Sequence, residues 1–207
     1  VEVDMTAANA YRQGLPAMAG QPGLKPSYTA LLLAAVVRAL EAHPAVNARW
    51  AEDAIEEIED INLGIAVALP DGLIVPVLRR VQRKTVLEIH REAEALVEKA
   101  RRGKLTAEEY TGSTFTISNL GPYGVDQFTA IINPPNSAVL AVGQIKDKAA
   151  VIQGTIHIRP MTTMTLSSDH RVIDGALAAQ FMGTLKRILE SADFHSKAGS
   201  GESKARG

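Results

Sequence analysis

Hydrophobic residues recur along the chain with two different periods, so the sequence predicts both helices and strands. Ser27 precedes an apolar run that lasts to His43 and stops at Pro44, which predicts a largely buried helix with Ser27 as its N-cap. Between Thr85 and Arg102 the apolar residues have helical spacing, with acidic residues early and basic residues late, as the helix dipole favours. Two more helices are predicted, a short one opened by a capping box at 106–109 and a closing one at 173–189.

Alternation of apolar and polar residues predicts an edge strand at 1–5 and the first arm of a hairpin. The clearest case is a hairpin over residues 61–77, whose turn is Pro70-Asp71-Gly72. Residues 7–15 have helical character, but the glycines and prolines that follow break the pattern. The other predicted strands are one or two short strands within 50–60, and strands at 114–118, 137–145, 149–152 and 155–167. Helices mixed with antiparallel hairpins indicate an α+β fold, with one open mixed sheet flanked by helices in a single domain.

Composition narrows the functional classes. The chain has no cysteine, which excludes a thiolate nucleophile and a thiolate metal site, and its net charge of −1 argues against a nucleic-acid partner. Its longest apolar run has only eight residues, at 30–37, whereas a membrane span needs about 20. We expect the folded domain to cover 1–190 and a polar, mobile tail to cover 191–207. Because the sequence opens inside a strand-like pattern, we interpret it as a piece of a longer chain.

Two segments carry candidate chemistry. His170 stands between a strand and a helix, close to Asp169, Arg171 and Asp174, and Asp174 could cap that helix. These residues suit a catalytic turn, a turn held by salt bridges, or a metal site that would lack a fourth ligand. Ser118 ends a strand of alternating hydroxyls that enters a glycine-rich loop, where it is either an ordinary strand residue or a donor to an oxyanion. No Gly-x-Ser-x-Gly sequence surrounds Ser118, so a hydrolase nucleophile is disfavoured.

The motif at 169–175, Asp-His-Arg-Val-Ile-Asp-Gly, resembles the His-x-x-x-Asp-Gly signature of the dihydrolipoyl acyltransferases, the core components of 2-oxoacid dehydrogenase complexes. Further blocks resemble the family in the same order, at 2–6, 61–67, 71–77, 114–121, 131–135 and 138–143. The resemblance implies a trimeric, chloramphenicol acetyltransferase-like fold. It also implies transfer of an acyl group from dihydrolipoamide to coenzyme A, which is a substrate. The lipoyl group would be carried on a domain that this sequence does not contain.

The resemblance also implies roles for individual residues. His170 is the general base that takes the thiol proton of coenzyme A, and Ser118 donates to the tetrahedral oxyanion. Asp174 organises the loop through an ion pair rather than by carrying a proton. Asn119 and Phe128 are expected to bind substrate, with Phe128 at the position of an acyl-pocket aromatic. Residues 118–128 look most like the acetyl-transferring members, and no basic residue there invites a succinyl carboxylate.

The expected partners follow from the same family. The chain would form a homotrimer with active sites between subunits, able to build a larger core that binds the decarboxylase and dihydrolipoamide dehydrogenase components. Its location would be the bacterial cytoplasm or the mitochondrial matrix.

The alternatives to an acetyltransferase are a non-catalytic core component, a branched-chain or succinyl acyltransferase, and a small-alcohol acetyltransferase. Arg79, Arg80 and Lys104 either meet the phosphates of coenzyme A or are simply solvated.

Overall fold

The fold is built on one mixed sheet. The computed structural model describes residues 1–20 and 24–194. The strand order is β1 (Glu2–Asp4), β11 (Thr155–Ser168), β9 (Ala138–Val142), β8 (Phe115–Asn119), β4 (Leu63–Ile65) and β7 (Val77–Leu78). Strand β8 runs parallel to β9 and to β4, whereas the other pairs are antiparallel. The predicted α+β class, with an open mixed sheet and flanking helices, is confirmed.

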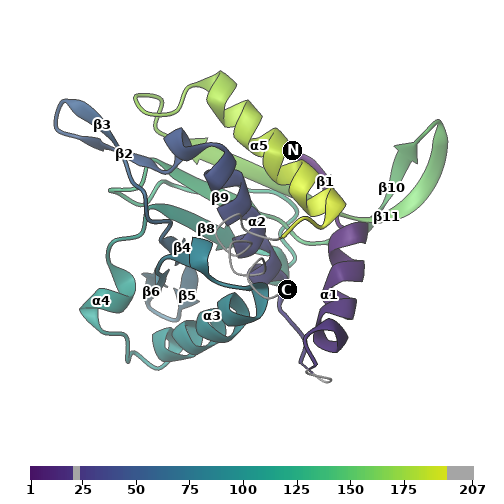
Figure 1. Cartoon of the computed structure of the whole chain (residues 1–207), viewed down its shortest axis with the longest axis horizontal. Helices are drawn as coiled ribbons and strands as arrows, with labels where there is room; N and C mark the ends of the chain where they lie inside the picture. Colours follow the sequence, from purple (N-terminus) through teal and green to yellow (C-terminus); the bar gives the residue numbers. More distant parts are fainter. Residues whose placement is uncertain (21–23, 195–207) are drawn as a thin grey trace, which may run out of the picture.

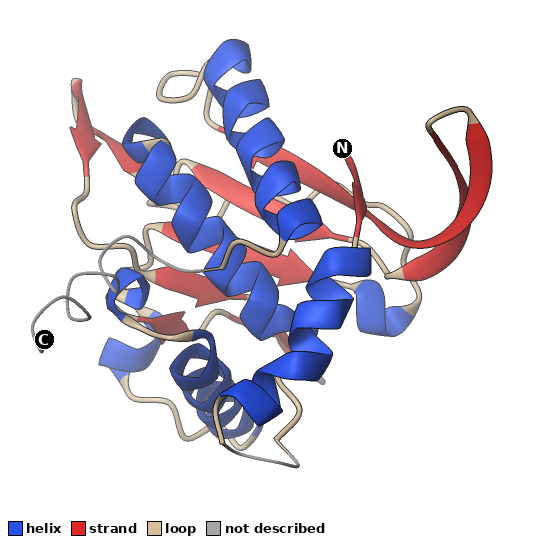
Figure 2. Cartoon of the chain, turned by 45° about the vertical axis from the view of Figure 1, so that its right-hand side comes forward, coloured by secondary structure: helices blue, strands red, loops and turns tan. Residues whose placement is uncertain are grey.

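The helices lie together on one face of this sheet (Figures 1 and 2). They are α1 (Thr6–Met18), α2 (Tyr28–Ala42), α3 (Val86–Arg101) and α5 (Gly175–Ser191), with short α4 (Ala107–Tyr110) beyond them. Single 3₁₀ turns occur at Pro44–Val46, Val81–Arg83 and Gly121–Tyr123. Helix α2 packs against both α3 and α5, and most of its residues are buried, which explains its nearly unbroken apolar sequence. None of the helices in the described ranges is long and apolar enough to cross a bilayer.

The predicted helix starts are confirmed by hydrogen bonds. Ser27 Oγ accepts from the backbone of Ala30 at 3.2 Å. Thr85 and Glu88 form a reciprocal capping box at the start of α3, and a second capping box opens α4. Helix α1 runs past Pro16, although prolines and glycines argued against a long helix there. The buried residues Ala8 and Leu15 pack α1 onto the core, and this packing outweighs the poor local propensity.

The predicted hairpin at 61–77 is divided between two sheets. Its tip forms a separate ribbon of β5 (Val67–Leu69) and β6 (Gly72–Ile74), whereas β4 and β7 belong to the main sheet. Pro76, which has no N–H, lies between the two parts and accepts from Ile65 through its carbonyl at 2.9 Å. The ladder between the two arms is therefore interrupted near this proline, whereas β4 keeps its pairing with β7 and also pairs with β8 on its other side.

Two hairpins project from the body of the molecule (Figure 1). One joins β2 (Ala48–Ala51) to β3 (Ala54–Glu57), so the predicted short strands begin two residues earlier than expected. The other joins β10 (Lys146–Ile152) to the first half of β11, and β10 begins three residues before its predicted start.

Near the C-terminus, α5 continues to Ser191. Phe194 is buried against Tyr11, and the two ring centroids are 4.8 Å apart. The packed part of the chain therefore extends to residue 194, past the predicted start of the tail at 191, and the rest of the predicted tail (195–207) lies outside the described residues.

Candidate active site

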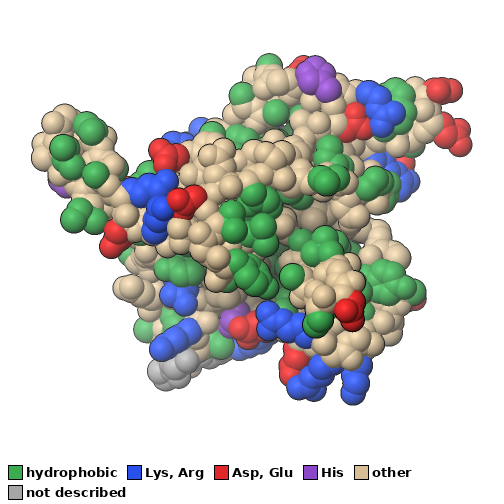
Figure 3. All heavy atoms as spheres, turned by 180° about the vertical axis from the view of Figure 1, so that it is seen from behind, with side chains coloured by type: hydrophobic (Ala, Val, Ile, Leu, Met, Phe, Trp, Pro, Cys, Tyr) green, Lys and Arg blue, Asp and Glu red, His purple; other side chains and the backbone are tan. Residues whose placement is uncertain are grey.

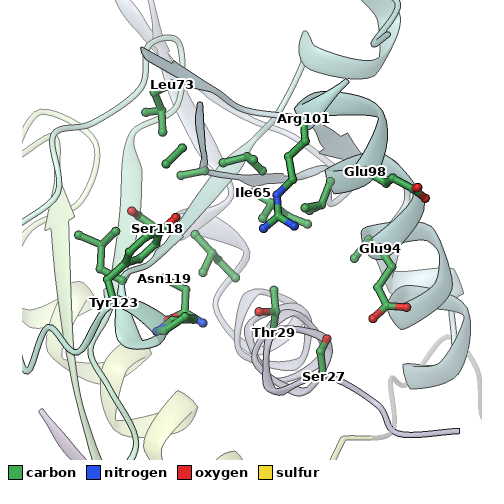
Figure 4. A pocket seen from close by; sticks show the side chains of 18 residues that line it. Ser27, Thr29, Ile65, Leu73, Glu94, Glu98, Arg101, Ser118, Asn119 and Tyr123 are labelled. Atoms are coloured by element: carbon green, nitrogen blue, oxygen red, sulfur yellow. The ribbon is translucent and has the colours of Figure 1, made fainter. Parts of the chain in front are cut away.

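Ser118 lies near the end of β8 and lines a cavity of about 680 Å³. Along β8 the buried Phe115 and Ile117 belong to the hydrophobic core, whereas Ser118 is only half-buried. The cavity lies between the end of β8, the β5–β6 ribbon, the start of α2 and one side of α3 (Figure 4). The predicted position of Ser118, at a strand end and open to a ligand, is thus found in the structure.

The cavity combines an apolar wall with a few polar groups. The apolar lining includes Ile65, Val67, Leu73, Val97, Ile117 and Leu120. Asn119 also lines the cavity, but its Oδ1 accepts from the backbone of Gly121 at 2.9 Å. A Cβ on Gly121 would lie 2.9 Å from the carbonyl oxygen of Gly143, so only glycine fits where this loop crosses its neighbour. Asn119 therefore holds the glycine-rich loop beside Ser118.

His170 stands in the turn between β11 and α5, and its side chain is exposed. The turn is held by Asp169, whose backbone donates to Ser137 at 2.8 Å and whose carboxylate pairs with Arg171 at 2.6 Å. Hydrogen bonds from Arg171 lower the pKa of Asp169 below its ordinary value. The guanidinium of Arg171 also lies over the ring of Trp50, 5.1 Å from its centroid. The expected salt-bridged turn is therefore present, and it presents His170 to the exterior.

Asp174 is the N-cap of α5. Its carboxylate accepts from the backbone of Leu177 at 2.8 Å, as the sequence allowed. Within the described ranges Asp174 makes no ion pair, and the ion pair of this turn joins Asp169 to Arg171 instead. The role implied by the resemblance, an ion pair through Asp174, is thus not found among the residues that the structure describes, and it stays a prediction. Because both aspartates are engaged in these contacts, the alternative of a metal site at this turn gains no support.

One chain does not bring Ser118 and His170 together. Through the register of the sheet Ser118 lies level with Ala141 of β9, and Ala141 lies level with Thr165 of β11. Strand β11 then continues to Ser168, three positions further, toward the opposite end of β8. With strand spacings near 4.8 Å and a rise near 3.3 Å, Ser118 and Ser168 are about 14 Å apart, and His170 lies beyond. His170 does not line the Ser118 cavity.

Phe128 does not line this cavity either. It is half-buried in the irregular segment that joins the Gly121–Tyr123 turn to β9. Its role in an acyl pocket therefore stays a prediction.

The structure also adds residues that sequence reasoning missed. Arg101, at the end of α3, and Tyr123, after the glycine-rich loop, both line the Ser118 cavity. The sequence could have indicated Arg101, because Ala93, Val97 and Arg101 are four residues apart and therefore lie on one face of α3. Arg79, an alternative contact for phosphate, donates instead to the backbone oxygens of Glu108 and Thr111, at 2.7 and 3.0 Å.

The sequence of this chain was compared with models of known protein families. The family model described as 2-oxoacid dehydrogenases acyltransferase (catalytic domain) matches residues 1–195. The chain belongs to this family. The resemblance found in the motifs is thereby confirmed.

Named relatives of the acyltransferase domain differ in the acyl group of their complexes. A dihydrolipoyllysine-residue acetyltransferase component of the pyruvate dehydrogenase complex from Rickettsia conorii is 44% identical over 77% of this chain and 39% of its own length. A lipoamide acyltransferase component of the branched-chain alpha-keto acid dehydrogenase complex from Bacillus subtilis is 40% identical over 93% of this chain and 46% of its own. A succinyltransferase component of the 2-oxoglutarate dehydrogenase complex from Haemophilus influenzae is 41% identical over 82% of this chain and 42% of its own. The chain spans less than half the length of these relatives.

Solved structures agree with the acyltransferase fold. The Azotobacter vinelandii dihydrolipoamide acetyltransferase superimposes with a TM-score of 0.87 and 37% identity, over 93% of this chain and 80% of that one. The cubic core of a pyruvate dehydrogenase multienzyme complex gives 0.87 and 38% identity, over the same shares of the two chains. A chloramphenicol acetyltransferase gives 0.57 at 18% identity, over 91% of this chain and 86% of that one, which confirms the predicted fold alone.

Proposed function

We propose that this domain transfers an acyl group, acetyl in the first place, from acyl-dihydrolipoamide to coenzyme A. The observation that carries the proposal is the placement of Ser118 and His170 at separate positions on the surface of a confirmed acyltransferase domain. Ser118 opens into a ligand-sized cavity, and His170 is exposed on a turn that holds an ion pair between Asp169 and Arg171.

The Azotobacter vinelandii acetyltransferase supports the choice of these two residues. A serine, a histidine and an asparagine have been investigated for their role in the catalytic mechanism of that protein, and they are separated in sequence by 52 and then by 4 residues. Ser118, His170 and Asp174 have the same two separations in this chain. Asp174 thus stands at the position of the asparagine, and either side chain suits a helix N-cap.

In the proposed reaction His170 takes the proton from the thiol of coenzyme A. A free thiol has a pKa of about 8.5 and is mostly protonated at neutral pH, so the attack needs a base. The thiolate sulfur then bonds to the thioester carbon, and the resulting oxyanion accepts a hydrogen bond from the hydroxyl of Ser118. When the intermediate collapses, the bond from carbon to the dihydrolipoamide sulfur breaks, and that sulfur takes the proton back from His170. Acyl-coenzyme A and dihydrolipoamide are the products.

We infer that the site is completed between subunits. The base must come within about 3.2 Å of the thiol sulfur, and Ser118 must reach the oxygen on the carbon that this sulfur attacks, so the two side chains must flank one small group. In one chain the sheet separates Ser118 from the end of β11 by about 14 Å. A closed trimer can place His170 of one subunit opposite Ser118 of the next. The projecting β10–β11 hairpin suits such an assembly, because Val151, Ile156 and Ile158 are each more than 70% exposed on it (Figure 3, left). A larger core with decarboxylase and dihydrolipoamide dehydrogenase partners is part of the same proposal.

The acyl group is assigned from residues 118–128. This segment resembles the acetyl-transferring members and contains no basic residue for a succinyl carboxylate. The test compares acetyl, isobutyryl and succinyl transfer between coenzyme A and dihydrolipoamide, with chloramphenicol as an alternative acceptor. We expect acetyl transfer to dihydrolipoamide to have the highest kcat/KM. Acetylation of chloramphenicol alone, or no transfer by a folded trimer, would refute the proposal.

A further inference from the structure

The β2–β3 hairpin contacts the turn that carries His170, although the two segments are about 120 positions apart in sequence. The hairpin projects on the side of the molecule where α5 begins (Figures 1 and 2). Trp50 of β2 makes the contact: the guanidinium of Arg171 lies over its ring, 5.1 Å from the ring centroid. A guanidinium within about 6 Å of an indole centroid makes a cation–π interaction. The proposed reaction makes no use of Trp50.

Arg171 is the link between Trp50 and the backbone of this turn. Its Nε and one Nη donate to the carboxylate of Asp169 at 3.0 and 2.6 Å, and its backbone N–H donates to the same carboxylate at 3.0 Å. The carbonyl of Asp169 accepts from the backbones of Val172 and Ile173, at 3.0 and 2.9 Å, and Ile173 is fully buried. His170 therefore lies between two residues whose side chains hold each other, and one of these two side chains rests on Trp50.

The position of Trp50 is set by the core and not by the turn. Its side chain is half-buried and packs against the hydrophobic core, and in the hairpin Trp50 lies opposite Ile55. The neighbouring cross-strand pair, Arg49 and Glu56, forms an ion pair at 2.7 Å. Because successive residues of a strand point to opposite faces, this ion pair lies on the other face of the hairpin from Trp50.

An exposed base needs support of this kind. The side chain of His170 is exposed, and in the proposed reaction it must come within about 3.2 Å of a thiol that is bound beside a neighbouring subunit. A misplacement of 1 Å can lower a rate by about 10²-fold. We propose that Trp50 is a positioning residue for His170, which acts through Arg171 and touches neither substrate. This inference rests on the proposed function.

A double-mutant cycle tests whether Trp50 acts through Arg171. Trp50→Leu removes the aromatic ring and should lower kcat for acetyl transfer by about two- to fivefold, the factor that corresponds to an exposed cation–π contact, with both KM values unchanged. Trp50→Phe keeps an aromatic face and should retain most of the activity. In the Arg171→Ala background Trp50→Leu should cause no further loss, because the group through which it acts is gone.

The matched control is Arg49→Gln, which removes the ion pair on the other face of the same hairpin and should keep the wild-type kcat. Melting curves and the trimer mass show that each variant folds. Trp50→Met takes the place of Trp50→Leu if the leucine variant does not form trimers.

Fluorescence tests the contact without turnover. Trp50 is the only tryptophan of the chain, so tryptophan emission reports on this ring alone. Arg171→Ala uncovers one face of the ring and should raise the constant for quenching by acrylamide. An unchanged quenching constant would show that Arg171 does not cover Trp50, and the inference would then fail.

Four kinetic results would also overturn the inference: wild-type kcat in Trp50→Leu, the same loss of kcat whether or not Arg171 is present, an equal loss in Arg49→Gln, or a raised KM with kcat unchanged. The last result would make Trp50 a substrate contact. Failure of the proposed function is distinguishable from all of these. It would appear as absence of acyl transfer by the folded wild-type trimer, whatever the quenching measurement shows.

Discussion

Mixing two inactive variants tests where the active site is assembled. His170→Ala removes the proposed base, and Ser118→Ala removes the proposed oxyanion donor. Alone, His170→Ala should lower kcat by about 10²–10⁴-fold. Ser118→Ala should lower it by about 10²–10³-fold with little change in KM, because an oxyanion donor acts in the transition state. Both side chains are at least partly exposed, so neither change should alter the melting temperature.

The size of the recovery follows from the sheet register and from trimer symmetry. Since about 14 Å separates Ser118 from the end of β11 in one chain, each site must take its histidine from one subunit and its serine from another. In a closed ring of three, every mixed trimer has one interface that joins the intact His170 to the intact Ser118. With equal mixing and random assembly, about a quarter of all interfaces are intact. The refolded mixture should therefore show about a quarter of the wild-type activity per chain.

The assay is acetyl transfer from acetyl-coenzyme A to dihydrolipoamide, measured on the two variants refolded together and refolded apart. The control mixes separately folded trimers without refolding, and these should stay inactive because their subunits do not exchange. Native mass spectrometry confirms the mixed trimers. If mixed trimers form and activity stays at the level of the single variants, both residues serve one subunit and the reasoning from the register is wrong.

Three further predictions follow from single residues. Asp174→Ala should lower the free energy of unfolding by about 1 kcal/mol through loss of the α5 cap, and Asp174→Asn should retain it; equal melting temperatures for the two variants would contradict the cap. Phe128→Ala should raise kcat/KM for branched acyl groups relative to acetyl, and an unchanged ratio would remove Phe128 from the acyl pocket. Because Arg171 lowers the pKa of folded Asp169 below 3.8, this contact should stabilise the fold above that pH and be lost as the pH falls through the lowered pKa. The melting temperature of Asp169→Asn should therefore lie below that of the wild type at neutral pH and approach it in acid, and a pH-independent difference would argue against the ion pair.

The sequence by itself predicted where α2, α4 and α5 begin, and it indicated the family. N-capping joins residues two or three positions apart, so the caps at Ser27 and Asp174 and the capping box at Thr106 could be identified from local sequence alone. The histidine motif and the ordered blocks around it predicted the acyltransferase family and directed attention to His170 and Ser118. Caps and motifs can be recognised in a sequence because each depends only on residues that are close together along the chain.

Only the tertiary structure decided how distant segments meet. The pairing of β4 with β8 joins residues about fifty positions apart, and the predicted hairpin is divided between the main sheet and a separate ribbon. Packing against the core carried α1 through Pro16 and buried Phe194 beyond the expected end of the domain. The side of α3 that faces Ser118 depends on how the helix is packed, so the inward position of Arg101 followed only from the assembled fold. These positions depend on the free energy gained when segments that are distant in sequence bury apolar surface against each other. A short stretch of sequence does not show which distant segment it will contact.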